Sequence, residues 1–153
     1  MAIDVTQSPA QLLLELIDYA FDKQSWHGPN LNSALRGLRA KQAASALPKR
    51  KSIWQQLLHA AYWKQRALNK LTATTRFPRS PSNWPRMPAP PTERHWRTDL
   101  TLLHDIHTKF RAAVAALPPR HLDLKTRRLI EGVALHDIYH AGQICLLRRH
   151  LKI

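Results

Sequence analysis

Residues 126–151, TRRLIEGVALHDIYHAGQICLLRRHL, predict one long helix with two histidines in its middle. His136 and His140 are four residues apart, a spacing that stacks two side chains on the same helical face. Two imidazoles placed in this way can bind one metal ion. Alternating steps of three and four residues define a seam that is expected to face inward. The residues of this seam are Leu129, Val133, His136, His140, Gln143 and Leu147. Both histidines thus occupy core positions, where a polar ring is costly unless a ligand or a hydrogen-bonding partner satisfies it.

The rest of the chain is also expected to be helical. Its 153 residues suffice for one domain, residues 1–153, and 44% of them are hydrophobic, which argues against disorder. Only 4 glycines occur, no stretch alternates apolar and polar residues, and long segments show helical spacing. These features predict an all-α protein.

Capping residues mark where two of the predicted helices begin. Ser8 is followed by Pro9 at the first helical position and by Gln11 three residues on, which forms a capping box. Ser52 and Gln55 form a second capping box ahead of a long helix that ends near residue 71. A shorter helical piece is predicted between these two helices.

Residues 76–91 contain six prolines and cannot form a long helix. A flexible linker here would divide the chain into halves too small to bury their apolar stripes. We therefore expect a stiff crossover that lies along the helices, between the second and third main helices. Trp84 and Met87 are its predicted anchors.

The next predicted helix, about residues 92–116, carries one histidine in an otherwise apolar seam. The seam is Trp96, Leu100, Leu103, His107, Phe110 and Val114. The connection to the last helix is short, which predicts that these two helices are antiparallel neighbours. His107 lies 10 residues before Leu117, and His136 lies 10 residues after Thr126. At 1.5 Å per residue both are roughly 15 Å from the turn, so spacing alone nominates His107 as a third metal ligand.

The chain is strongly basic, because 24 Lys and Arg residues against 10 Asp and Glu residues give a formal net charge of +14. Such a charge attracts anions, including nucleic acid and acidic membrane surfaces. The basic residues are scattered over every predicted helix, which favours a solvated basic surface over a dedicated nucleic-acid face.

Cys145 is the single cysteine of the sequence, which excludes an internal disulfide and a cysteine-rich metal site. The apolar residues 12–14 are followed at once by Glu15. Neither a signal peptide nor a membrane-spanning helix is predicted. The expected location is the cytoplasm, with no membrane partner.

Three segments together resemble the DinB/YfiT-like family of metalloenzymes. They are residues 25–31 (SWHGPNL), residues 52–63 (SIWQQLLHAAYW) and residues 132–144 (GVALHDIYHAGQI). The resemblance covers nearly the whole chain and implies a four-helix bundle of the DinB/YfiT-like type, with a short extra helix after the first helix.

The resemblance also implies a divalent metal, zinc or nickel, held by three histidines. The family's ligand on the second main helix is matched by His59, and its pair on the last helix is matched by His136 and His140. This assignment replaces the nomination of His107 from spacing. His107 is then either a pocket residue near the metal or a hydrogen-bonded core histidine.

Other residues close to the histidine pair have open roles. Gln143 is either a substrate contact or a buried amide, and Tyr139 flanks the seam and can reach a pocket; these two and His107 are the candidates for catalysis. Asp137 points roughly 100° away from His136 and is expected to be a surface or helix-pairing acid rather than a general base. Trp63 is expected to pack against protein, with a cavity wall as its alternative role.

The motif HDIYH at 136–140 is similar to the zincin motif with Asp in place of Glu. The longer metzincin pattern is missing, because Gln143 and Leu146 stand where a glycine and a histidine are required. No predicted strand is available to bind an extended peptide. A metalloprotease is therefore disfavoured.

The resemblance favours thiol-dependent transferase chemistry on a small molecule, with a low-molecular-weight thiol as cosubstrate. A metal-dependent hydrolase is the first alternative. The second is a non-catalytic, metal-stabilised basic protein that binds nucleic acid. The resemblance is also compatible with a homodimer.

Overall fold

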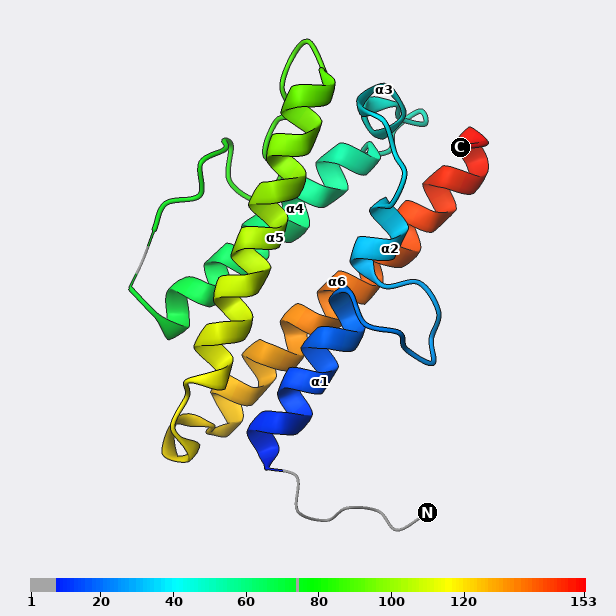
Figure 1. Ribbon diagram of the computed structural model, residues 1–153. Coiled ribbons are helices and arrows are strands. Elements are labelled where there is room, and N and C mark those ends of the chain that lie inside the picture. The colour runs from blue at the N-terminus through cyan, green and yellow to red at the C-terminus, as the bar shows by residue number, and fades with distance from the viewer. Residues whose placement is uncertain (1–7, 74) are drawn as a thin grey trace.

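The computed structural model describes residues 8–73 and 75–153 (Figure 1). The helices in this part of the chain are α1 (Pro9–Phe21), α2 (Leu31–Leu35), α3 (Ala40–Ala44), α4 (Ile53–Leu71), α5 (Glu93–Ala115), the 3₁₀ helix η1 (Pro119–His121) and α6 (Leu124–Leu151). No strand occurs among the described residues, so the all-α prediction is confirmed for them. The predicted domain range also includes residues 1–7 and Thr74, which lie outside the described residues.

The four long helices α1, α4, α5 and α6 pack side by side. Both α4 and α1 lie against α5 and against α6 (Figure 1). In contrast, α5 and α6 are not closely packed against each other, although only a short connection joins them. The prediction that these two helices are direct neighbours is therefore wrong: they face each other across α1 and α4. None of the described helices has the length and apolar character needed to span a bilayer.

Local sequence determines where the long helices begin. In α1, Ser8 N donates to Gln11 Oε1 at 2.7 Å and Gln11 N donates to Ser8 Oγ at 3.3 Å. In α4, Ser52 N donates to Gln55 Oε1 at 3.0 Å and Gln55 N donates to Ser52 Oγ at 3.2 Å. Both predicted capping boxes are thus present, and they satisfy backbone N–H groups that have no partner within the helix.

The single short helix predicted after α1 is two short helices, α2 and α3. Gly37 lies between them with a φ of +75°, a left-handed conformation that costs glycine little. The Arg148 side chain of α6 fixes α2 in place, because its Nη1 donates to the backbone oxygens of Ala34 at 2.8 Å and Arg36 at 2.9 Å. Figure 1 shows α2 beside the C-terminal half of α6.

The crossover segment (residues 75–92) contains no helix and runs along the outside of α4 and α5. Arg79 Nη2 donates to Oδ1 of Asp99 on α5 at 2.5 Å. The predicted anchors make contacts: Trp84 stacks on His59 of α4, and Met87 Sδ accepts a hydrogen bond from the Ser52 hydroxyl at 3.8 Å. These contacts hold the crossover segment against the N-terminal half of α4.

The core consists of two apolar clusters with a polar layer between them. One cluster gathers around Trp54 and the other around Phe110. At the boundary between the clusters α4 contributes Lys64, α5 contributes His107 and α6 contributes Asp137, all of them buried. The polar layer therefore passes through three helices, directly beside the histidine pair of α6.

Candidate metal centre

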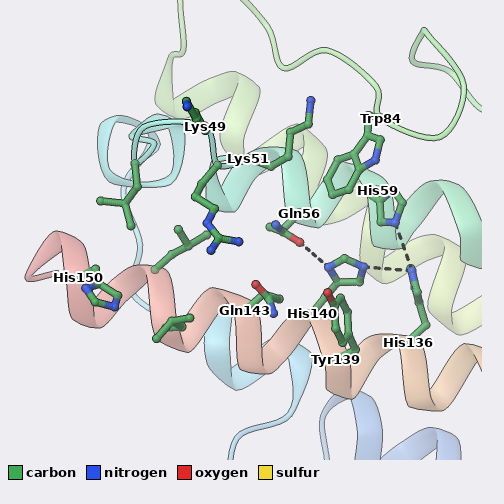
Figure 2. Close-up of a pocket in the computed structure, with 14 residues that line it drawn as sticks. Lys49, Lys51, Gln56, His59, Trp84, His136, Tyr139, His140, Gln143 and His150 are labelled. Carbon is green, nitrogen blue, oxygen red and sulfur yellow. Dashed lines mark hydrogen bonds between the residues drawn. The ribbon is translucent and has the colours of Figure 1, made fainter.

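Three histidines from two helices meet at one end of a cavity. His59 comes from α4, and His136 and His140 come from successive turns of α6. One ring nitrogen of each lies within 4.8 Å of the others. Nε2 of His136 is 3.3 Å from Nε2 of His59 and 3.0 Å from Nε2 of His140 (Figure 2). These three side chains, which the family resemblance nominated, are brought together by the fold.

Two of the distances between the three nitrogens match those around a metal ion, and all three nitrogens lie within 4.8 Å of one another. Two imidazole nitrogens bound to one ion at about 2.0–2.1 Å lie about 3.3–3.4 Å apart in a tetrahedral site and about 2.9 Å apart in an octahedral one. The separations of 3.3 and 3.0 Å fall at these values. The three histidines therefore form a group that could hold a divalent ion.

Hydrogen bonds at the opposite ring positions orient two of the histidines. Nδ1 of His59 donates to the backbone oxygen of Asn83 at 2.6 Å, and Nδ1 of His140 donates to the Gln56 side-chain oxygen. Both partners are oxygen acceptors, so the Nδ1 atoms carry the protons and the Nε2 lone pairs are free. Both lone pairs face Nε2 of His136, whose single N–H can satisfy only one of them. A cation would satisfy all three nitrogens at once.

Burial favours the uncharged form of these imidazoles. It lowers the pKa of His59 below its usual value. Burial, with the neighbouring imidazoles as a further cause, lowers the pKa of His136 to about 4 and that of His140 to about 3. All three rings are therefore neutral at pH 7, the state in which imidazole binds a metal ion.

The crossover segment closes the site over His59. The Trp84 ring stacks on the His59 ring with centroids 3.9 Å apart and an angle of 15°. Asn83, whose oxygen accepts from His59, has a φ of +68° and is held by Trp63, whose Nε1 donates to the Asn83 side chain at 2.9 Å. Trp63 thus supports the crossover segment but stays 43% exposed, so it packs against protein only in part, and it does not line this cavity, whereas Trp84 does.

The cavity has a volume of about 520 Å³ and extends from the histidines along one face of α6 (Figure 2). Gln143 and Tyr139 both line it. Gln143 is half-buried, whereas Tyr139 is 61% exposed and places its ring 5.1 Å from that of His140. Both residues therefore line the cavity, and their roles as substrate contacts stay predictions.

His107 belongs to the polar layer and not to the three-histidine cluster. Its ring stacks on Phe21 of α1 at 3.6 Å, and its Nδ1 accepts from the Lys64 ammonium at 3.2 Å. The equal height predicted for His107 and His136 is consistent with this contact, because Lys64 also binds Asp137, the neighbour of His136. The nomination of His107 from spacing is wrong because α4 and α1 separate α5 from α6.

Asp137 pairs two helices, one of the two roles predicted for it. Its Oδ2 lies 2.5 Å from Lys64 Nζ, and the two side chains are 2% and 0% exposed. The alternative of a surface acid is wrong. The carboxylate binds Lys64 and does not line the cavity of the three histidines, although it lines a second cavity that His136 also borders.

A second group with metal-ligating atoms consists of Asp18, Asp22 and His107. Arg111 already binds Asp18 through two hydrogen bonds of 2.6 and 2.9 Å, and Lys64 already donates to His107. These cationic side chains supply the positive charge that a metal would bring. This group is therefore a network of ion pairs and hydrogen bonds.

Sequence reasoning missed two residues that orient the histidines. Gln56 lies one turn before His59 on the same helix, a spacing that could have identified it as a neighbour of the site. Asn83 could not have been identified in this way, since its carbonyl reaches His59 only because the crossover segment folds back over α4.

No family model, no curated protein and no solved structure matches this chain. Membership of the DinB/YfiT-like family therefore stays a prediction from the sequence motifs.

Proposed function

We propose that the protein is a metalloenzyme of the DinB/YfiT-like type, with zinc or nickel bound by His59, His136 and His140. We propose further that it transfers a low-molecular-weight thiol to or from a small molecule. The observation that carries the proposal is the convergence of the three Nε2 atoms at one end of a cavity large enough for a small substrate.

The residues around the histidines have distinct roles in this proposal. The Asn83 oxygen and the Gln56 side chain hold two imidazoles in the tautomer that binds metal. Trp84 covers His59 and keeps water from that side of the ring. A bound divalent ion would supply Lewis acidity, which lowers the pKa of a coordinated thiol or water.

Thiol chemistry is favoured over hydrolysis by the side chains around the cavity. None of the described residues that line it is a carboxylate, so a hydrolase would have no Asp or Glu to take a proton from water. A thiol, with an unperturbed pKa of about 8.5 against about 15.7 for water, releases its proton to solvent more readily and depends less on such a base. Gln143 and Tyr139 are placed to hold a substrate by hydrogen bonds, and they remain the candidates for catalysis. The metal-dependent hydrolase remains the alternative.

The non-catalytic alternative is a metal-stabilised basic protein that binds nucleic acid. The formal charge of +14 supports binding of anions in general. A nucleic-acid role predicts an affinity that falls steeply as salt rises, whereas no binding at low salt would exclude it. A homodimer is also a proposal; exposed apolar side chains such as Leu12, Leu135 and Leu146 could be covered by a second copy.

Elemental analysis of protein purified without chelators tests the site. We expect about one zinc or nickel per chain, with loss of metal but a retained helical circular dichroism spectrum in His59→Ala and His136→Ala. His121→Ala, an exposed histidine on η1, is the matched control and should keep the metal. Substoichiometric metal that does not rise when zinc or nickel is added would refute the proposal. Unfolding on metal removal would instead indicate a structural ion.

Activity is tested on the metal-loaded protein with small electrophiles combined with different cellular thiols. Thiol transfer that is lost together with the metal in His59→Ala supports the proposed class. Consumption of the electrophile without any thiol would favour the hydrolase.

A further inference from the structure

Three consecutive cations line the same cavity as the histidines. Lys49, Arg50 and Lys51 form the end of the connection between α3 and α4, and all three contribute to the cavity wall. Figure 2 shows Lys49 and Lys51 on the side of the cavity opposite α6. The connection turns sharply here, since Arg50 N donates to the Leu47 oxygen at 3.0 Å and Lys49 has a φ of +58°. A left-handed conformation is uncommon for lysine, so the fold maintains this turn at some cost.

These cations have no acidic partner in the part of the chain that the structure describes. Among the described residues, none of the three forms an ion pair, and no carboxylate lines the cavity. Lys51 instead places its ammonium 5.4 Å from the centroid of the Trp84 ring, which itself stacks on His59. One aromatic ring therefore separates a free cation from a proposed metal ligand. A concave site with charge of one sign concentrates ligands of the opposite sign.

The cavity is elongated, and its walls change in character along its length. It follows α6 from His140 past Gln143 and Leu147 to His150, which Figure 2 shows at the end away from the other histidines. Ten residues of helix correspond to roughly 15 Å. Leu47 and Leu146 add apolar surface to this stretch. The site therefore suits a ligand with an extended, partly apolar body.

We infer that the substrate is a small organic anion, whose reacting group lies at the three histidines and whose oxyanion group, a carboxylate or a phosphate, is bound by Lys49, Arg50 and Lys51. This inference rests on the proposed metal site and adds a substrate class to it. The cations of the turn act in binding and orientation, because they lie outside the histidine cluster.

Matched chelators test the inference without requiring any knowledge of the reaction. The metal-loaded protein, reconstituted with cobalt(II), is titrated with suberic monohydroxamate and with 8-hydroxyoctanohydroxamate, which differ only in a terminal carboxylate. The change in the cobalt absorption spectrum reports binding. We expect the carboxylate compound to bind about tenfold more tightly, because exposed ion pairs each contribute up to a few-fold. A phosphate-terminated hydroxamate of the same length shows which oxyanion is preferred.

The triple variant Lys49→Ala/Arg50→Ala/Lys51→Ala should bind both compounds with equal affinity. Its affinity for the neutral compound should match that of the wild type. The variant Arg94→Ala/Arg97→Ala/Lys109→Ala is the control, because it removes the same charge from the exposed surface of α5 and should keep the tenfold preference.

Equal binding of the two hydroxamates by the cobalt-loaded wild type would overturn the inference while leaving the metal site intact. So would failure of both to bind a protein that holds the metal. Failure to take up any metal would overturn the proposed function itself.

Discussion

Removing one member of the Lys64–Asp137 ion pair is expected to destabilise the protein by about 3–5 kcal/mol. The two side chains are 0% and 2% exposed, so the remaining charge has no access to water. Burial raises the pKa of Asp137 and lowers that of Lys64, whereas the charge of each partner opposes the shift of the other, so loss of one partner leaves the remaining charge more unfavourable. Lys64→Met also leaves Nδ1 of His107 without its donor.

The expected destabilisation can be compared with the free energy of unfolding of the whole protein. Domains of this size unfold with about 5–15 kcal/mol, so a loss of about 4 kcal/mol removes a large part of the stability. At about 2–4 °C per kcal/mol, the melting temperature should fall by roughly 10 °C. Asp137→Asn keeps the shape of the side chain and isolates the effect of charge.

The double variant Lys64→Met/Asp137→Val provides the decisive comparison. Because it removes both charges and keeps apolar volume in the core, its stability should lie within about 2 kcal/mol of the wild type. Urea denaturation of the wild type, both single variants and the double variant gives the coupling energy. If the double variant loses the sum of the single losses, or if either single variant loses less than about 1 kcal/mol, the reasoning is refuted.

Two further predictions concern the histidines. Gln56→Leu removes the acceptor of His140 Nδ1 and should weaken zinc binding about 10–100-fold in a competition assay with a chelating dye. The control is Gln24→Leu, a substitution at an exposed position. Equal zinc affinity of the two variants would contradict the role of Gln56. In metal-free protein, burial lowers the pKa of His107 to about 2, so below pH 6.5 the unfolded chain takes up a proton that the folded chain does not. For this residue, the free energy of unfolding should therefore fall by about 1.4 kcal/mol per pH unit as the pH drops from 6.5 toward 4. Urea denaturation at several pH values measures this slope, and His107→Gln should reduce it. An unchanged slope would contradict the lowered pKa of His107.

The sequence allowed much of the fold to be predicted from local rules. Helix starts at Ser8 and Ser52 followed from capping chemistry, which depends on neighbours three residues apart. The inward position of His140 followed from the 3.6-residue period, because that period fixes the direction of each side chain within its own helix. The anchoring of the crossover segment followed from its prolines and from Trp84.

The third histidine could not be derived in the same way. The helical period predicts on which face of its own helix His107 or His59 lies. It does not predict which helices pack against each other. Because α4 packs closely against α6 and α5 does not, His59 reaches the α6 pair, whereas His107 contacts Lys64 and Phe21. The resemblance to a family nominated His59 without supplying a physical reason for it.

The sequence by itself therefore determined the long helices and the histidine pair at 136 and 140, but only part of the buried face of α6, where Asp137 and Ile144 are buried and Leu129 and Gln143 of the predicted seam are only half-buried. Only the tertiary structure decided the partner of Asp137, the acceptors of His59 and His140, and the position of Lys49, Arg50 and Lys51 at the same cavity. The physical reason is the distance along the chain over which each interaction acts. Capping and periodicity act over a few residues of one helix, whereas the site is built from side chains that meet only when separate segments pack together.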